Sequence, residues 1–407
     1  MTLTISARSA DIHRSRAGDG AAARDFIARA EAAAGVAEQF ADAVDREARF
    51  PAEAFAAIRE QRLLGMLAPT EFGGDGARAA DVVDVCAILG RACASTAMIF
   101  AMHQVKLACI ARHTRGAAWP QAFLRDVAER QLLLASSTTE GGNGADIRAS
   151  DAPVRVNGGR VALRRDASCI SYGREADAIV TTARRSDDAA KSDQVLVVFR
   201  RQDYTLEPTQ TWDTLGMRGT CSVGFILDAE GEAEQVLAEP YERIHSQTMV
   251  PYAHMFWSAA WTGVAAGAVA RARAFVRQAA RAAGGRMPPA AAQLTRARLS
   301  LETLRAAVQA GVASFERHAA DPGGLATAEA QLALTLLKVE ASELATTTVL
   351  TAMRACGLAG YRNDSPFAMG RFLRDILSSP IMINNDRILA NADPAVLTSE
   401  APTALSL

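Results

Sequence analysis

Two different spacings of apolar residues divide the chain into three regions. Over residues 21–130, and again over residues 241–407, apolar side chains recur three and four positions apart, which predicts helices. Residues 1–20 are polar and lack this spacing, so we predict a flexible tail there. The Gly- and Pro-rich run 284–289 is one of the breaks that divide the second helical region into several helices.

Residues 131–240 have the spacing of strands instead. Short runs of branched and aromatic residues are separated by turn residues, and 154–156 and 161–163 flank Asn157-Gly158-Gly159, which is the pattern of a tight hairpin. No helix of useful length separates the runs, so an antiparallel sheet or small barrel is favoured over a parallel sheet. The order of helices, antiparallel strands and helices predicts an α+β fold.

Charge and composition exclude several classes of protein. The 407 residues carry 44 Lys and Arg against 45 Asp and Glu, which gives a formal charge of −1 and no general attraction to nucleic acid or anionic lipid. Because 49% of the residues are hydrophobic, the chain can bury a core, and intrinsic disorder is excluded. We therefore expect a soluble globular protein with no nucleic-acid partner.

One stretch has the length of a membrane span. Residues 246–270 contain no Asp, Glu, Lys or Arg. They do contain Gln247, Pro251, His254 and many Ala and Gly, so their hydropathy is modest. A helix buried on all sides by other helices has the same signature, and we favour that interpretation over membrane insertion.

Cysteine spacing and the start of the chain indicate a reducing compartment. The six cysteines are scattered without a C-x-x-C pair, so we expect buried thiols rather than a disulfide framework or a zinc site. The six histidines show no metal-ligand spacing either, and no metal site is predicted. The first residues lack the apolar core of a signal peptide, so a cytoplasmic protein is expected.

Two segments of the strand region have the composition of ligand-binding loops. Residues 136–147 join consecutive hydroxyl residues to three glycines, which let backbone N–H groups approach a ligand closely. Residues 169–173, Cys-Ile-Ser-Tyr-Gly, place a hydroxyl at the end of a strand. Taken singly, each segment is explained better as a plain polar loop than as a ligand-binding loop. No H-E-x-x-H, G-x-S-x-G or phosphate-loop motif accompanies them.

Together with the order of the three regions, five segments resemble the acyl-CoA dehydrogenase superfamily over most of the chain. They are residues 62–74, 139–146, 170–173, 212–222 and, as a pair, 357–361 with Arg374-Asp375. The resemblance implies an N-terminal helical domain, a central antiparallel β domain and a C-terminal four-helix bundle, with FAD bound between them. It also implies a homo-oligomer, either a dimer or a tetramer.

The resemblance also implies flavin contacts at particular residues. Hydroxyl and backbone groups of the first loop would line the isoalloxazine ring, Ser171 would hydrogen-bond near its N5 atom, and Cys169 stands where many members stack an aromatic side chain. Arg286 would contact the pyrophosphate, and Gly357 the adenosine end, of a neighbouring subunit's FAD. The cofactor-binding residues implied in this way are Ser136, Thr138, Thr139, Gly144, Ala145, Cys169, Ser171, Arg286, Gly357 and Asn385.

The glutamate that acts as the base in acyl thioester desaturation is missing. The family places it in the loop that corresponds to residues 381–387 or at the start of the first bundle helix, here Met255-Phe256-Trp257, and neither holds Glu. Asp386 and His254 are the candidate substitutes. Asp386 is also interpreted as the cap of a helix beginning at Arg387, and His254 as a hydrogen-bonded histidine of the core.

Three functions fit the sequence. The first, narrowly preferred, is FAD-dependent α,β-desaturation of an acyl thioester on CoA or a carrier protein, with electron-transfer flavoprotein as a partner. The second is a monooxygenase of the same fold that receives FAD or FMN reduced by a separate flavin reductase. Such relatives lack the Glu but often carry a histidine in the loop of residues 381–387, which has none here. The third is a non-catalytic relative that binds acyl groups or flavin.

Overall fold

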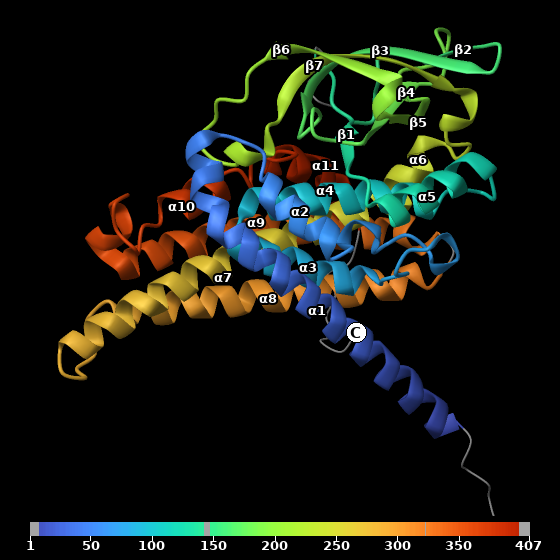
Figure 1. Ribbon diagram of the computed structural model, residues 1–407. Coiled ribbons are helices and arrows are strands. Elements are labelled where there is room, and N and C mark those ends of the chain that lie inside the picture. Colours follow the sequence, from blue (N-terminus) through green and yellow to red (C-terminus); the bar gives the residue numbers. More distant parts are fainter. Residues whose placement is uncertain (1–7, 142–146, 322, 399–407) are drawn as a thin grey trace, which may run out of the picture.

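Five helices form the N-terminal part of the computed structural model, which describes residues 8–141, 147–321 and 323–398 (Figure 1). They are α1 (Arg8–Glu47), α2 (Ala52–Glu60), α3 (Ala79–Ala92), α4 (Ala94–Ala111) and α5 (Ala118–Arg130). Helix α1 begins inside the segment predicted to be a tail. Helix α4 is almost wholly buried, because α3, α7 and the β region surround it.

The strands of the central region form two sheets. One has the order β1 (Leu134–Ser137), β4 (Ala178–Arg184), β5 (Gln194–Arg200), and the other the order β2 (Arg155–Asn157), β3 (Arg160–Ile170), β7 (Val223–Glu232), β6 (Tyr204–Gln210). The predicted hairpin at Gly158-Gly159 is confirmed: both glycines have positive φ, and β2 pairs antiparallel with β3.

One strand pair departs from the predicted antiparallel pattern. Strand β1 runs parallel to β4, with Leu134 opposite Ala178, while the other strand pairs are antiparallel. The parallel pairing is possible because β2 and β3 lie between β1 and β4 along the chain, and this long connection returns the chain to the same end of the sheet.

Long helices dominate the C-terminal region. They are α7 (Val250–Ala282), α8 (Ala291–Ala319) and α9 (Ala328–Tyr361), followed by the shorter α10 (Gly370–Ile376) and α11 (Asn385–Thr398) and preceded by α6 (Tyr241–Ile244) and a π-helical turn (His245–Met249). Most of the uncharged stretch 246–270 lies in the buried part of α7, as predicted. Helix α7 packs against α3, α4 and α9. The four buried cysteines and the two half-buried ones are all free thiols.

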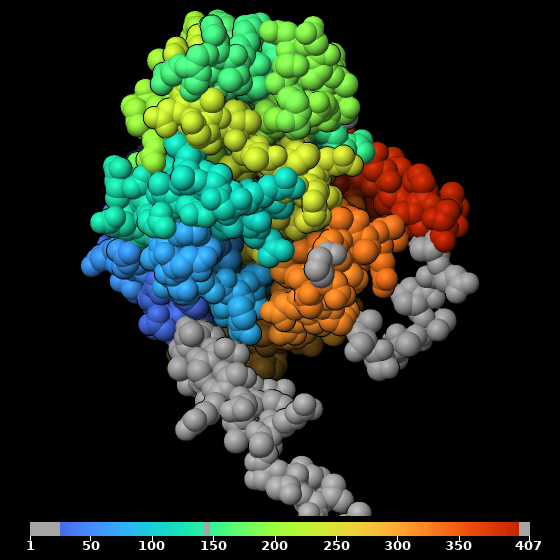
Figure 2. Space-filling model, turned by 90° about the vertical axis from the view of Figure 1, so that its right-hand side faces the viewer, coloured from blue at the N-terminus to red at the C-terminus, as the bar shows by residue number. Residues whose placement is uncertain are grey.

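By length and composition, α4 is a helix of the described chain that could cross a membrane, and 89% of it is buried inside the protein. In Figure 2 the strand region (green) lies above the helical layers, and the beginning of the C-terminal region (yellow) lies between them.

Helix α10 connects the three regions. Its Asp375 accepts a hydrogen bond from the backbone N–H of Met217 in the β region, with N and Oδ1 2.7 Å apart. Arg371, which is buried, pairs with Asp42 of α1 at 2.8 Å, and Arg374 pairs with Asp45 of the same helix. These contacts fix the strand region against both sets of helices, and the candidate site lies along this junction.

Candidate functional site

The carboxyl end of β1 carries the first predicted group of site residues. Ser136 is half-buried on this strand, and Thr138 and Thr139 follow it, also half-buried. His103 of α4 holds the strand, since its Nδ1 accepts the Leu134 N–H (3.0 Å) and its Nε2 donates to the Leu64 carbonyl (2.8 Å). Burial lowers the pKa of His103 to about 4, so the ring is neutral in this role.

Glu140 anchors the loop that follows. Its carboxylate is buried, 3.1 Å from Arg165 of β3, and accepts hydrogen bonds from the Ser150 hydroxyl and the Asp151 N–H. Glu140 also pairs through its backbone with Ala167, so the loop runs beside the end of β3. The two sequence motifs therefore lie close together in the fold. Gly144 and Ala145 lie outside the described residues.

Ser171 begins a chain of three hydroxyl groups at the end of β3. Its Oγ lies 2.8 Å from the Ser222 Oγ, which in turn lies 2.8 Å from the Thr220 Oγ1. Thr220 Oγ1 donates to the carbonyl of Met217, also at 2.8 Å. Burial raises the pKa of the neighbouring Cys169 thiol, which lies beside the Ser171 and Ser222 hydroxyls. Sequence reasoning selected Ser171 but not the two hydroxyls behind it.

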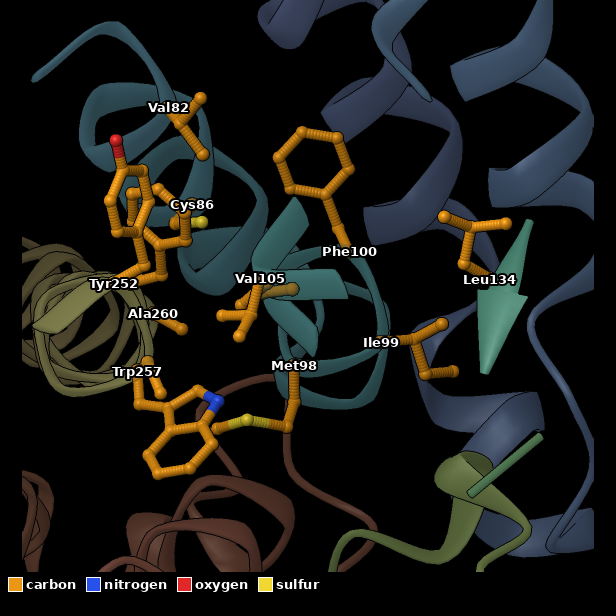
Figure 3. Close-up of a cluster of buried hydrophobic side chains, with 14 of the residues drawn as sticks. Val82, Cys86, Met98, Ile99, Phe100, Val105, Leu134, Tyr252, Trp257 and Ala260 are labelled. Carbon is orange, nitrogen blue, oxygen red and sulfur yellow. The ribbon is translucent and has the colours of Figure 1, made fainter. Parts of the chain in front are cut away.

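Buried polar groups without partners test whether these residues fit a flavin. The Ser137 hydroxyl and the indole N–H groups of Trp257 and Trp261 are buried and have no hydrogen-bond partner among the described residues. Trp257 lies on α7 in a cluster of apolar side chains with Met98 of α4 (Figure 3). Of these unpartnered groups, only Ser137 belongs to the hydroxyl loops, and the half-buried hydroxyls of Ser136, Thr138 and Thr139 beside it offer donors and acceptors that fit the ring nitrogens and carbonyl oxygens of a flavin.

His254 lies in the core between two helices. Its Nδ1 is 3.1 Å from the backbone carbonyl of Leu334 on α9, and the side chain is buried. Burial lowers its pKa to about 3. This geometry is that of the core histidine considered from the sequence.

Asp386 lies at the surface, in the first turn of α11. That helix begins at Asn385 rather than at Arg387, and its cap is Asn384, whose Oδ1 accepts the N–H of Asp386 at 3.0 Å. The capping role considered for Asp386 therefore belongs to Asn384.

Asn385 is buried within a polar network of the helical bundle. Its Oδ1 accepts a hydrogen bond from Lys338 of α9 (2.7 Å) and its Nδ2 donates to Ser342 (2.9 Å). Lys338 also donates to the Ser379 carbonyl (3.2 Å) and lies 5.6 Å from the ring of Trp261. Burial lowers the pKa of Lys338 to about 8. The Asn385 amide therefore holds the loop in place, and Lys338 is a buried cation that sequence reasoning missed.

Arg286 and Gly357 are not brought to the site within one chain. Arg286 is exposed in the turn between α7 and α8, which projects away from the strand region in Figure 1. Gly357 introduces a kink in α9, with φ 55°, and is flanked by the exposed Leu358 and Tyr361. Their contacts to a neighbouring subunit's cofactor stay predictions.

A surface hollow of about 370 Å³ lies elsewhere, between the loop around Thr70 and the ends of α4 and α7. Arg112 and Tyr252 line it, together with Glu71. None of the predicted site residues contributes to this hollow, so the hydroxyl loops and not the hollow define the candidate site.

Models of one protein family match both helical regions of the chain. Residues 22–131 match the family model "Acyl-CoA dehydrogenase, N-terminal domain", and residues 248–390 match "Acyl-CoA dehydrogenase, C-terminal domain". The chain belongs to the acyl-CoA dehydrogenase superfamily. The predicted α+β fold with helical domains on either side of a β domain is thereby confirmed. Like other members of the superfamily, the chain is a flavoenzyme.

Relatives within the superfamily differ in chemistry. The amino sugar nitrososynthase DnmZ of Streptomyces peucetius is 25% identical over 353 residues, which is 83% of this chain and 84% of DnmZ. Cyclohex-1-ene-1-carbonyl-CoA dehydrogenase of Syntrophus aciditrophicus is 26% identical over 58% of this chain and 57% of its own. The structure of FMN-bound TdsC from Paenibacillus sp. A11-2 superposes with a TM-score of 0.81 at 18% identity, covering 93% of this chain and 98% of TdsC.

Proposed function

We propose that this chain is the oxygenase component of a flavin-dependent monooxygenase that receives reduced FMN from a separate reductase. The observation that carries the proposal is that no base stands where desaturation needs one. Desaturation removes a weakly acidic α-proton, and this requires a carboxylate or similar base held at the reacting carbon. Residues 255–257 are Met, Phe and Trp, and the loop residue aligned with the usual base is Ile383.

The two substitute bases have unsuitable surroundings. Asp386 is exposed on the first turn of α11, and His254 is tied to the Leu334 carbonyl with a pKa of about 3. A base with so low a pKa holds a proton too weakly to remove one from a carbon acid. Oxygenation by reduced flavin needs no such base, and this favours oxygenation over desaturation.

The relatives support the same choice. Similarity to the nitrososynthase DnmZ extends over 83% of the chain, whereas similarity to the CoA dehydrogenase covers 58%. TdsC, which is a dibenzothiophene monooxygenase and binds FMN, has the same fold. The names of these relatives refer to a nitrogen and a sulfur substrate. We infer that a heteroatom, either an amine nitrogen or a thioether or thiophene sulfur, is oxygenated here.

The described residues have separable tasks in such a reaction. Bound flavin supplies electrons to oxygen. Ser136, Thr138 and Thr139 would hold the polar edge of the ring through hydroxyl and backbone groups, and Ser171 would contact it from the end of β3. Trp257 and the apolar side chains around it would keep water away from the reacting atoms.

One pair of assays separates oxygenation from desaturation. The purified protein is mixed with chemically reduced FMN, oxygen and either a dTDP-linked amino sugar or dibenzothiophene, and the products are analysed by mass spectrometry. We expect an added oxygen atom in one of the two substrates. In parallel, the protein loaded with oxidised flavin is titrated anaerobically with acyl-CoA thioesters, and we expect no loss of flavin absorbance. Bleaching by a thioester without oxygenation would overturn the proposal in favour of desaturation.

A further inference from the structure

We propose that Thr220 and Ser222 are positioning residues that orient the hydroxyl of Ser171 as a hydrogen-bond acceptor, so that the site prefers reduced over oxidised flavin. This inference rests on the proposed function, because it assumes that flavin binds at Ser171. It follows from the number of protons that the hydroxyl chain contains and from the group at which the chain ends.

Thr220, the hydroxyl farthest from Ser171, sets the direction of the hydrogen bonds along the three hydroxyl groups. The carbonyl of Met217 can only accept, so the hydrogen bond at 2.8 Å must use the single hydroxyl proton of Thr220. Met217 is itself held in place, since its carbonyl also accepts from the Trp212 indole N–H (3.1 Å) and its N–H donates to Asp375. The acceptor that sets the direction is therefore rigid.

Each following bond has only one possible direction. With the Thr220 proton committed, the bond at 2.8 Å between Thr220 and Ser222 requires Ser222 to donate. The Ser222 proton is then also committed, so the bond at 2.8 Å between Ser222 and Ser171 requires Ser171 to donate. The oxygen of Ser171 is left with lone pairs alone for any further partner.

Burial keeps water from competing for the hydrogen bonds between these hydroxyl groups. Thr220 and Ser222 are 3% and 6% exposed, so water has little access to the inner two hydroxyls. The Cys169 thiol beside the chain is kept protonated, because burial raises its pKa. The sulfur is a weak acceptor as well as a weak donor, and the hydroxyls of Ser171 and Ser222 lie within hydrogen-bonding reach of it. Whether Ser171 donates to Ser222 or to this sulfur, its proton is used inside the protein and its oxygen still faces a ligand as an acceptor.

Flavin changes its hydrogen-bonding character on reduction. The central ring nitrogen N5 carries no hydrogen in the oxidised ring, where it is an acceptor, and carries a hydrogen in the reduced ring, where it is a donor. If the Ser171 oxygen can only accept, it forms a hydrogen bond with the N5–H of the reduced ring. With the oxidised ring, the Ser171 oxygen and N5 are both acceptors and repel each other. Such a site would take reduced flavin from a partner and release the oxidised form after turnover.

The experiment compares the dissociation constants of oxidised FMN and of dithionite-reduced FMN, measured anaerobically by fluorescence titration. Thr220→Val has the shape of threonine without the hydroxyl. It frees the Ser222 proton to turn toward Ser171, which can then donate outward. Thr220→Ser keeps the hydroxyl and is the matched control. The Met217 carbonyl keeps its Trp212 donor in both variants.

We expect wild-type protein and Thr220→Ser to bind reduced FMN more tightly than oxidised FMN. In Thr220→Val the ratio of the two constants should fall by about three- to tenfold, the range that one hydrogen bond supplies. Ser222→Ala breaks the chain one step nearer the ligand and should give the same fall, which provides a second test should Thr220→Val fold poorly.

The outcomes distinguish this inference from the proposed function. An unchanged ratio in Thr220→Val or Ser222→Ala, with flavin still bound, overturns the positioning role and leaves the oxygenase proposal standing. Failure of the wild-type protein to bind either form of FMN overturns both. A general loss of affinity that affects both redox forms equally would indicate a structural role alone, and would also overturn the inference.

Discussion

At the scale of single residues, Asp386 shows how a position on a helix limits what a carboxylate can do. It is exposed in the first turn of α11, where an acid stabilises a helix by about 0.3–1 kcal/mol. We predict that Asp386→Asn lowers the free energy of unfolding by no more than about 1 kcal/mol. The same change should leave oxygenation within about twofold, since no proton is taken from carbon. A hundredfold slower flavin reduction by a thioester would instead identify Asp386 as a base.

Lys338 is a residue whose polar contacts lie inside the bundle. Lys338→Met leaves the Asn385 Oδ1 without its donor, and an unpaired buried acceptor costs about 1–3 kcal/mol. Lys191→Met, at a surface lysine paired with Asp151, should change stability by less than about 1 kcal/mol and is the control.

Combining Lys338→Met with Asn385→Leu removes both buried partners. We expect the double variant to be more stable than the sum of the two single changes predicts, by at least about 0.5 kcal/mol in urea unfolding. Strict additivity would mean that the Lys338–Asn385 contact does not couple α9 to α11.

At the scale of elements, the close packing of α3 on α7 depends on two glycines. A Cβ atom on Gly90 would lie 2.2 Å from the Ala260 carbonyl oxygen, and one on Gly263 would lie 2.1 Å from that of Ala87. Each helix thus places a glycine against the backbone of the other. Since these neighbours are backbone atoms, the helices must separate to admit a side chain.

We therefore predict that Gly263→Ala destabilises the protein by about 2–4 kcal/mol, in the range of overpacked cores. Gly35→Ala in α1 is the control, because nothing lies within 4 Å of its added Cβ. At that exposed helical position alanine should stabilise by about 0.5–1 kcal/mol. Thermal unfolding of both variants measures the difference. Equal effects at Gly263 and Gly35 would contradict the close contact.

Elements defined by neighbouring residues were predictable from the sequence, and contacts between distant ones were not. The hairpin at Gly158-Gly159 and the buried helix over residues 246–270 follow from local composition, and both are confirmed. The parallel pairing of β1 with β4 was missed, because it depends on where the chain returns after a long connection. Spacing along the chain contains no such information.

In the candidate site, too, residues in local motifs were predictable from the sequence, and their distant partners were not. Ser171 was selected from a local motif, whereas its order with Ser222 and Thr220 depends on contacts across about fifty residues of sequence. Asn385 was selected by its place in a loop, but its partner Lys338 comes from another helix. Resemblance to a family therefore selected candidate residues, and only the folded contacts show which of their polar groups already have other partners.

At the scale of the whole molecule, the junction around α10 joins all three regions, and its contact with the β region uses one buried carboxylate. Asp375 is held by the Met217 N–H, and burial raises its pKa to about 6. Between its ordinary value and about 6, the folded protein binds this proton more tightly than the unfolded chain does. Lowering the pH through that interval therefore stabilises the folded protein, because Asp375 takes up its proton more readily there than in the unfolded chain.

Three buried histidines have the opposite effect on how stability depends on pH. Their combined effect should exceed that of Asp375. Burial lowers the pKa of His103 and His113 to about 4 and that of His254 to about 3, from 6.5. Between about pH 4 and 6.5 the unfolded chain therefore binds more protons at these sites than the folded protein does, so stability falls as the pH falls. Each histidine contributes up to about 1.4 kcal/mol per pH unit, and Asp375 offsets about one of the three.

We predict that the free energy of unfolding, measured in urea at half-unit steps, drops steeply from pH 6.5 to pH 4 and changes little from 6.5 to 7.5. Replacing His103 by Gln keeps a polar side chain at the β1 junction but removes one titrating group, so the slope should become shallower by up to about 1.4 kcal/mol per unit. Asp375→Asn should make the slope steeper, because the opposing proton uptake is lost. A profile that is flat in the wild type, or unaffected by either change, would show that these buried groups do not control the acid stability of the fold.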